Sequence, residues 1–111
     1  MSSEKLSDTM MHCIEECERC SRACIETVIH CLGEGGKHSE VNHIRILLDC
    51  INICETNRDF MVRGSEFSKQ ICASCEDICE KCADDCEKFE DEKMKSCAEF
   101  CKSCAEACGK M

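Results

Sequence analysis

The chain of 111 residues contains no proline, tryptophan or tyrosine, and leucine, isoleucine, valine and phenylalanine together number only 20. This composition, with a net charge of −9, is typical of disordered chains. No apolar run approaches the roughly 20 residues of a membrane span. The acidic excess argues against nucleic acid and anionic membranes as partners. From Met1 to Glu4 onward there is no basic segment followed by an apolar one, so we expect no secretory signal and a cytoplasmic protein.

The chain has 16 cysteines, and we expect them to supply the core that the few large apolar residues cannot fill. In one segment they are separated by alternating steps of three and four: Cys72, Cys75, Cys79, Cys82 and Cys86. On a helix this spacing places all of them on one face. We call each such run a cysteine ladder. Two further ladders have the same spacing: Cys13, Cys17, Cys20 and Cys24, and Cys97, Cys101, Cys104 and Cys108.

The periodicity predicts four helices, at about 4–32, 39–63, 65–89 and 90–109. Their connections are short, which makes successive helices antiparallel. We therefore predict an all-α protein, an antiparallel up-down-up-down four-helix bundle with a cysteine-lined core. Residues 1–111 are expected to form a single metal-binding domain.

The ends of these helices follow from capping preferences. Gly33 suits the position just after the first helix, and Gly64 the end of the second. Ser39 and Ser65 are the expected N-caps of the second and third helices. The acidic stretch 90–92 suits the beginning of the fourth helix, where the helix dipole favours negative charge.

The second helix has fewer cysteines than the others and a wider apolar face. Its inward stripe is His43, Leu47, Cys50, Cys54, Asn57 and Met61. Aliphatic residues beside the stripes of the first two helices predict self-association. The residues expected in that contact are Ile14, Ile25, Ile29, Ile44, Leu48 and Ile51.

Thiol chemistry restricts what the ladders can do. Neighbours on one helix face have Cβ atoms about 5–6 Å apart, too far for the about 3.5–4.5 Å of a disulfide, so only bridges between facing ladders remain. Each Zn²⁺ takes four ligands, and four Zn²⁺ on sixteen thiolates would leave a charge of about −8, whereas Cu⁺ can neutralise every thiolate. Because uncompensated buried charge is costly and thiolates select Cu(I), the ladders favour several Cu(I) ions per chain over zinc–thiolate storage.

An iron–sulfur electron-transfer protein is the alternative from another class. The bacterial C-x₂-C-x₂-C-x₃-C-P run is absent, and these cysteines keep helical register instead of wrapping a cluster. Colour distinguishes the two, since Cu(I)–thiolate proteins are colourless and iron–sulfur proteins are brown. No nucleophile–base pair, phosphate loop or paired catalytic carboxylate is present, so we do not expect an enzyme.

The ladders on four predicted helices resemble those of the cysteine-rich four-helix-bundle copper storage proteins (Csp family), specifically the cytosolic branch. The resemblance spans essentially the whole chain. It implies Cu(I) storage, buffering or detoxification by interior thiolates, a homotetramer, and copper donor or acceptor proteins as partners. The second helix departs from a full ladder at Leu47, Asn57 and Met61, where further cysteines could have stood.

All sixteen cysteines and one histidine are therefore candidate ligands. His43 is expected at the end of the bundle near the first loop, together with Cys31, Cys86 and Cys97. Met10 and Met61 lie at the opposite end and are expected to be core residues. His12 and His30 are predicted on the polar face, and His38 in the loop. The full set of candidate ligands is Cys13, Cys17, Cys20, Cys24, Cys31, Cys50, Cys54, Cys72, Cys75, Cys79, Cys82, Cys86, Cys97, Cys101, Cys104, Cys108 and His43.

Overall fold

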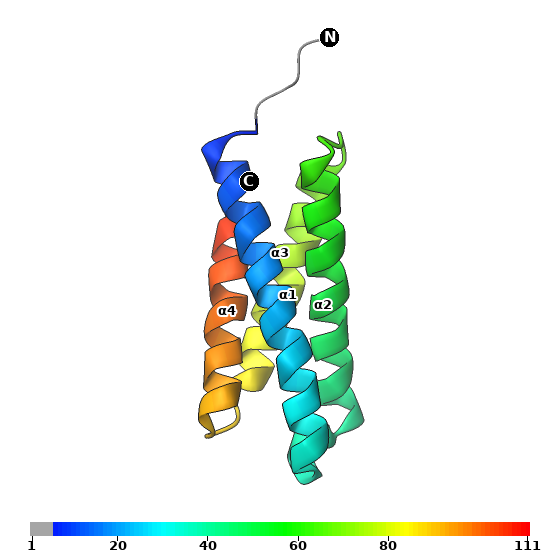
Figure 1. Ribbon diagram of the computed structural model, residues 1–111, viewed down its shortest axis with the longest axis vertical. Helices are drawn as coiled ribbons and strands as arrows, with labels where there is room; N and C mark the ends of the chain where they lie inside the picture. The colour runs from blue at the N-terminus through cyan, green and yellow to red at the C-terminus, as the bar shows by residue number, and fades with distance from the viewer. Residues whose placement is uncertain (1–5) are drawn as a thin grey trace.

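Four antiparallel helices form the protein in a computed structural model that describes residues 6–111. They are α1 (Asp8–Glu34), α2 (Val41–Val62), α3 (Ser68–Cys86) and α4 (Glu92–Gly109), with a short 3₁₀ helix, η1 (Gly36–Ser39), between the first two. Figure 1 shows them side by side, with the start of α1 and the end of α4 at the same end. The helix α1 packs against α2 and α4, and α3 packs against the same two. The predicted all-α four-helix bundle is confirmed.

The first helix differs from its predicted bounds at both ends. The predicted start at residue 4 lies outside the described residues, and the helix begins at Asp8, because the Ser7 hydroxyl accepts a hydrogen bond from the Met10 backbone N–H at 3.1 Å. At the other end Gly33 lies inside the helix, which continues to Glu34. Gly35, with φ of 72°, ends it. A glycine adopts this positive φ without the Cβ strain of other residues.

The predicted N-cap of the second helix is wrong. Ser39 ends η1, and its hydroxyl donates to the Gly36 carbonyl at 3.2 Å. Glu40, with extended backbone, occupies the N-cap position of α2 instead. The hydroxyl of Ser39 is already used within its own turn, which is the competing role that serine often takes.

The third helix is shorter than predicted. Ser65 is not its N-cap: the Ser65 hydroxyl accepts a hydrogen bond from the Phe67 backbone N–H at 3.1 Å in the preceding turn, and α3 begins at Ser68. The helix ends at Cys86, and Phe89 lies in the turn that follows. The N-cap of α4 is Asp91, within the predicted acidic stretch.

The core of the bundle consists of thiols. All sixteen cysteine side chains are buried, each at most 3% exposed. Leu47, Met61 and Met94 are the largest fully buried apolar side chains. The prediction that cysteine replaces the missing large apolar residues is therefore confirmed. Within residues 6–111, no helix has both the length and the apolar character needed to cross a membrane.

Candidate metal centre

The buried cysteine sulfurs lie along the inside of the bundle, and we call this arrangement the thiol column. In three groups of four, all the sulfurs lie within 4.8 Å of one another. The groups overlap, because two of them share Cys54 and two share both Cys20 and Cys50. They are Cys17, Cys54, Cys75 and Cys104; Cys20, Cys50, Cys54 and Cys79; and Cys20, Cys24, Cys50 and Cys101.

The spacing of these sulfurs suits metal ions better than disulfides. Cys54 Sγ lies 3.7 Å from Cys79 Sγ and 3.8 Å from Cys104 Sγ, far beyond the roughly 2.05 Å of an S–S bond. A tetrahedral ion with metal–sulfur bonds of about 2.3 Å would separate its ligands by about 3.8 Å. The bundle therefore holds these sulfurs at a separation that suits thiolate coordination of one ion.

Protons occupy this column in the absence of metal. Burial raises the pKa of the Cys31 thiol to about 11. Hydrogen bonding to Cys104 raises the pKa of Cys54, whereas Cys104 donates to Cys17 and lowers its pKa. In each S–H···S contact one sulfur holds the proton. Because only thiolates bind metal strongly, loading the column must release protons.

Asn57 lies among the sulfurs near the end of the column where α1 begins. Its Nδ2 donates to Cys17 Sγ at 3.4 Å and to Cys108 Sγ at 3.5 Å, and its Oδ1 accepts from Cys72 Sγ at 3.2 Å. Beyond it, Met61 Sδ lies 3.8 Å from Cys72 Sγ. Asn57, which stands on the stripe where a further cysteine could have stood, is thus hydrogen-bonded to three of the neighbouring thiols.

Cysteines and two methionines form the core near this end of the bundle. Cys13, Cys17 and Cys108 form a further group of three sulfurs within 4.8 Å of one another. Met10 is half-buried and packs against the core, and Met61 is fully buried. The packing of both methionines agrees with the prediction that they are core residues.

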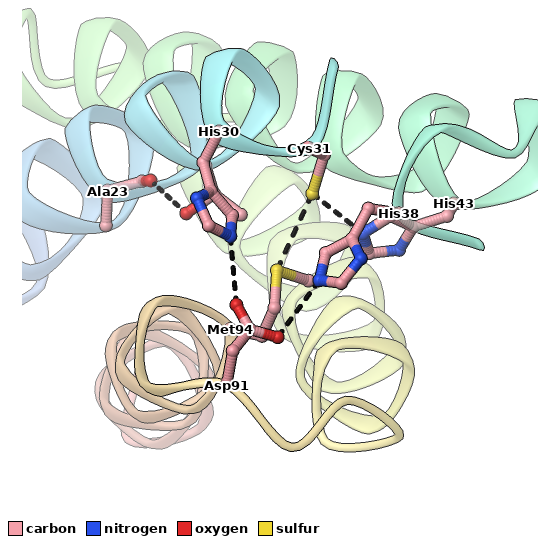
Figure 2. Close-up of polar contacts among 8 residues, drawn as sticks. Ala23, His30, Cys31, His38, His43, Asp91 and Met94 are labelled. Atoms are coloured by element: carbon pink, nitrogen blue, oxygen red, sulfur yellow. Dashed lines mark hydrogen bonds and ion pairs between the residues drawn. The ribbon is translucent and has the colours of Figure 1, made fainter. Parts of the chain in front are cut away.

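At the opposite end the column finishes in a site of mixed ligands. Cys31 Sγ lies 3.3 Å from His43 Nε2 and 3.5 Å from Met94 Sδ, and His43 Nδ1 is hydrogen-bonded to Asp85 Oδ2 at 2.5 Å. Figure 2 shows the Cys31 sulfur between Met94 and His43. The bond to Asp85 fixes the ring so that Nε2 faces the sulfurs, as carboxylates do for metal-binding histidines.

The sequence indicated only part of this end. It placed His43 beside Cys31, and the structure brings the two into contact. Met94 was missed, although it precedes Cys97 by three residues and so continues the α4 ladder. Asp85 was missed because no pattern links it to His43.

Other candidate ligands are buried in the core without joining a group of four. One of them is Cys97, whose Sγ lies 3.8 Å from Cys24 Sγ. Cys82 and Cys86 are fully buried but belong to none of the groups found in the described part of the chain. They continue the α3 ladder toward the end that carries His43.

One of the other histidines, His30, is not where the sequence predicted. His12 is exposed, as expected. His30 is not freely solvated on a polar face: it is half-buried and hydrogen-bonded to Asp91. His38 lies in the connection between α1 and α2, as predicted; there it is part of η1 and is also hydrogen-bonded to Asp91. The polar-face prediction failed for His30 because the turn before α4 covers that face.

Fold and site together define a class of protein, a four-helix bundle whose interior is a column of buried thiols spaced for soft metal ions. The family model for copper storage proteins matches residues 6–111, and the chain belongs to that family.

Solved structures with the same fold agree with this membership. The Cu(I)-bound copper storage protein BsCsp3 is 38% identical, with a TM-score of 0.89 over 94% of this chain and 98% of that one. A cytosolic copper storage protein from Streptomyces lividans, solved with five coppers, is 30% identical, with a TM-score of 0.87 over 93% of this chain and 91% of that one.

A curated relative matches over part of its length. The cysteine-rich protein YhjQ of Bacillus subtilis is 39% identical over 65 residues, which are 59% of this chain and 60% of the relative.

Proposed function

We propose that this chain binds and stores several Cu(I) ions in the thiolate column of its core. The observation that carries the proposal is the overlap of the four-sulfur groups, in which Cys20, Cys50 and Cys54 each belong to two groups. Shared sulfurs suit ions that take few ligands and bridge through thiolates. A monovalent soft cation also neutralises buried thiolates one for one, which Zn²⁺ at four thiolates per ion does not.

The proposed ligands are the sixteen cysteines and His43. Support comes from the burial of every cysteine and from the contact of His43 Nε2 with Cys31 Sγ at 3.3 Å. Met94 joins the set as a thioether ligand at the same end, because its Sδ lies 3.5 Å from Cys31 Sγ. Thioethers, like thiolates, are soft ligands that select Cu(I).

Anaerobic titration with Cu(I) against a competing chelator, with total metal analysis, tests the proposal. We expect uptake well above four equivalents per chain by a colourless protein. Binding of Zn²⁺ to the thiol column is expected to saturate at about four ions per chain, since each ion takes four thiolates. Saturation of both metals near four equivalents would contradict Cu(I) storage, and a brown protein as isolated would favour the iron–sulfur alternative.

The physiological setting is part of the same proposal. We infer a non-catalytic protein of the cytoplasm that receives copper from donor proteins or passes it to acceptor proteins. The S. lividans relative is described as cytosolic and as a copper storage protein, which supports both the location and the role.

We also propose that the chain assembles into a homotetramer through α1 and α2. The side chains of Ile25, Ile29 and Leu48 are 45%, 68% and 46% exposed. Of the other residues predicted in this contact, Ile51 is buried within the bundle itself, and Ile14 and Ile44 pack against its core. A surface with several exposed aliphatic residues on adjacent helices is unusual for a monomer. A monomeric mass in solution at micromolar concentration would refute the assembly.

A further inference from the structure

A second cluster of metal-binding side chains lies outside the thiol column. The Asp91 carboxylate is hydrogen-bonded to two histidines: Oδ2 to His30 Nε2 and Oδ1 to His38 Nε2, each at 2.9 Å. Figure 2 shows the carboxylate facing both rings. Ligand atoms of His30, Glu34 and His38 also lie within 4.8 Å of one another. The four residues come from α1, η1 and the turn before α4.

Packing against neighbouring rings holds the two imidazoles in place. The ring of His38 lies 4.4 Å from that of Phe89, centroid to centroid, and 5.6 Å from that of His30, which it meets edge-on at 82°. Both histidines are half-buried, at 26% and 20% side-chain exposure. Pre-ordered ligands lose little conformational freedom on binding, which favours affinity.

Asp91 completes the electrostatics of the cluster. Its two oxygens bond to the two rings, which holds the carboxylate beside the ligand atoms of both histidines. Two carboxylates, Asp91 and Glu34, then face two imidazoles. A divalent cation would balance both negative charges, in a chain whose net charge is −9.

The cluster is chemically unlike the column. It offers nitrogen and oxygen ligands, which suit Zn²⁺ and similar divalent ions, whereas the thiols select Cu(I). Cys31 follows His30 directly, yet its sulfur contacts His43 and Met94 inside the bundle. Successive residues on a helix point about 100° apart, so α1 separates the two sets of ligands.

We propose that His30, Glu34 and His38, with Asp91 as ligand or as the partner that orients both rings, form a binding site for Zn²⁺ or a similar divalent cation. The ion would join the end of α1, η1 and the start of α4, and so hold together the end of the bundle where Cys31, His43 and Met94 lie. The site does not require that the thiols hold Cu(I).

Zinc titration against a chromophoric chelator tests the site. It is run on the full chain, both metal-free and after Cu(I) loading, and each variant is compared with the wild type in the same form. Wild type is expected to bind one Zn²⁺ more per chain than His38→Ala in both forms. His12→Ala is the matched control, because His12 is exposed on α1 outside the cluster, and it should bind as the wild type does.

Two further measurements separate ligation from folding. Asp91→Asn preserves the size of the α4 N-cap and should lower zinc affinity about 10- to 100-fold, with an unchanged circular dichroism spectrum. In NMR spectra, one equivalent of Zn²⁺ added to the Cu(I)-loaded protein should shift the ring resonances of His30 and His38 but not those of His12. Equal zinc binding by the wild type and His38→Ala would overturn the site, and so would ring shifts confined to His12. Either result would show that the hydrogen bonds between Asp91 and the histidines only stabilise the turns.

Discussion

Replacing Cys54 by serine should remove more copper capacity than replacing Cys86 by serine. Cys54 Sγ lies 3.7 Å from Cys79, 3.8 Å from Cys104 and 3.9 Å from Cys75. Like Cys20 and Cys50, Cys54 belongs to two of the four-sulfur groups. Cys86 is also fully buried but belongs to no group in the described residues. The two variants therefore differ in the sharing of the lost sulfur, not in its burial.

The size of the effect follows from this sharing. Serine keeps the approximate size of cysteine but replaces a soft ligand with a hard one. Loss of Cys54 leaves both of its groups with three sulfurs, so we expect the loss of an ion from each. Loss of Cys86 should cost at most one. A buried hydroxyl without a partner costs about 1–3 kcal/mol, and because both positions are fully buried, this destabilisation should be similar in the two metal-free variants.

The assay is parallel anaerobic Cu(I) titration of both variants and the wild type against the same chelator, with circular dichroism to establish that both remain helical. Equal losses from Cys54→Ser and Cys86→Ser would show isolated sites instead of a shared column. Complete loss of binding in either helical variant would show a single cooperative cluster. Either result would refute the argument from shared sulfurs.

The reduced metal-free protein should already be helical by circular dichroism, because its four helices are amphipathic and bury apolar side chains such as Leu47, Met61 and Met94; a random-coil spectrum would show that metal drives folding. Its free energy of unfolding should fall as pH rises from about 9 toward 11. Burial raises the pKa of Cys31 from 9.0 to about 11, so the unfolded chain loses that proton first. Urea denaturation at several pH values measures this, and a constant free energy of unfolding across the range would contradict it. Ile29→Asp, which charges a side chain that is 68% exposed, should weaken self-association without changing helix content; sedimentation of this variant beside Glu26→Asp as control gives the result, and an unchanged oligomer would remove Ile29 from the interface.

The sequence predicted the core well because one spacing determines it. Alternating steps of three and four predict at once that a segment is helical and which of its residues face inward. Leu47, Asn57 and Met61 were placed on the stripe of α2 by that rule alone, and all three are fully buried. The same rule extends to Met94, which lies three residues before Cys97 and is fully buried.

Helix ends were predicted less well because several residues compete for each cap. The sequence favours Ser39 and Ser65 as N-caps, but each hydroxyl forms a hydrogen bond within its own turn. The helices α2 and α3 begin one and two residues later than those caps imply. Propensity ranks serine highly for both roles and does not decide between them. Only the path of the turn decides.

Contacts between distant segments were outside the reach of periodicity. His30 and Asp91 are 61 residues apart, and His38 and Asp91 are 53 apart. No helical spacing relates them; the turn before α4 brings them together once α1 and α4 have packed. The same holds for the bond between His43 and Asp85, which joins α2 to α3. The local pattern therefore predicts the thiol column and His43 at its end, but not the carboxylates that bond to the histidines there.

The small number of large apolar residues, which is typical of disordered chains, is explained by the close approach of the sulfurs in the thiol column. Sulfurs from four helices meet at 3.7–3.9 Å along the axis, and large or aromatic side chains at these positions would hold the helices too far apart for that contact. The shortage of leucine and phenylalanine inside the bundle is thus the condition for its sulfur spacing. Rules that count only large apolar residues misjudge such a chain because buried thiols pack as small hydrophobic groups when metal-free. Glu16 is buried but paired with Arg19 at 3.1 Å. Acidic residues such as Glu55, Glu99 and Glu106 lie outside the thiol core.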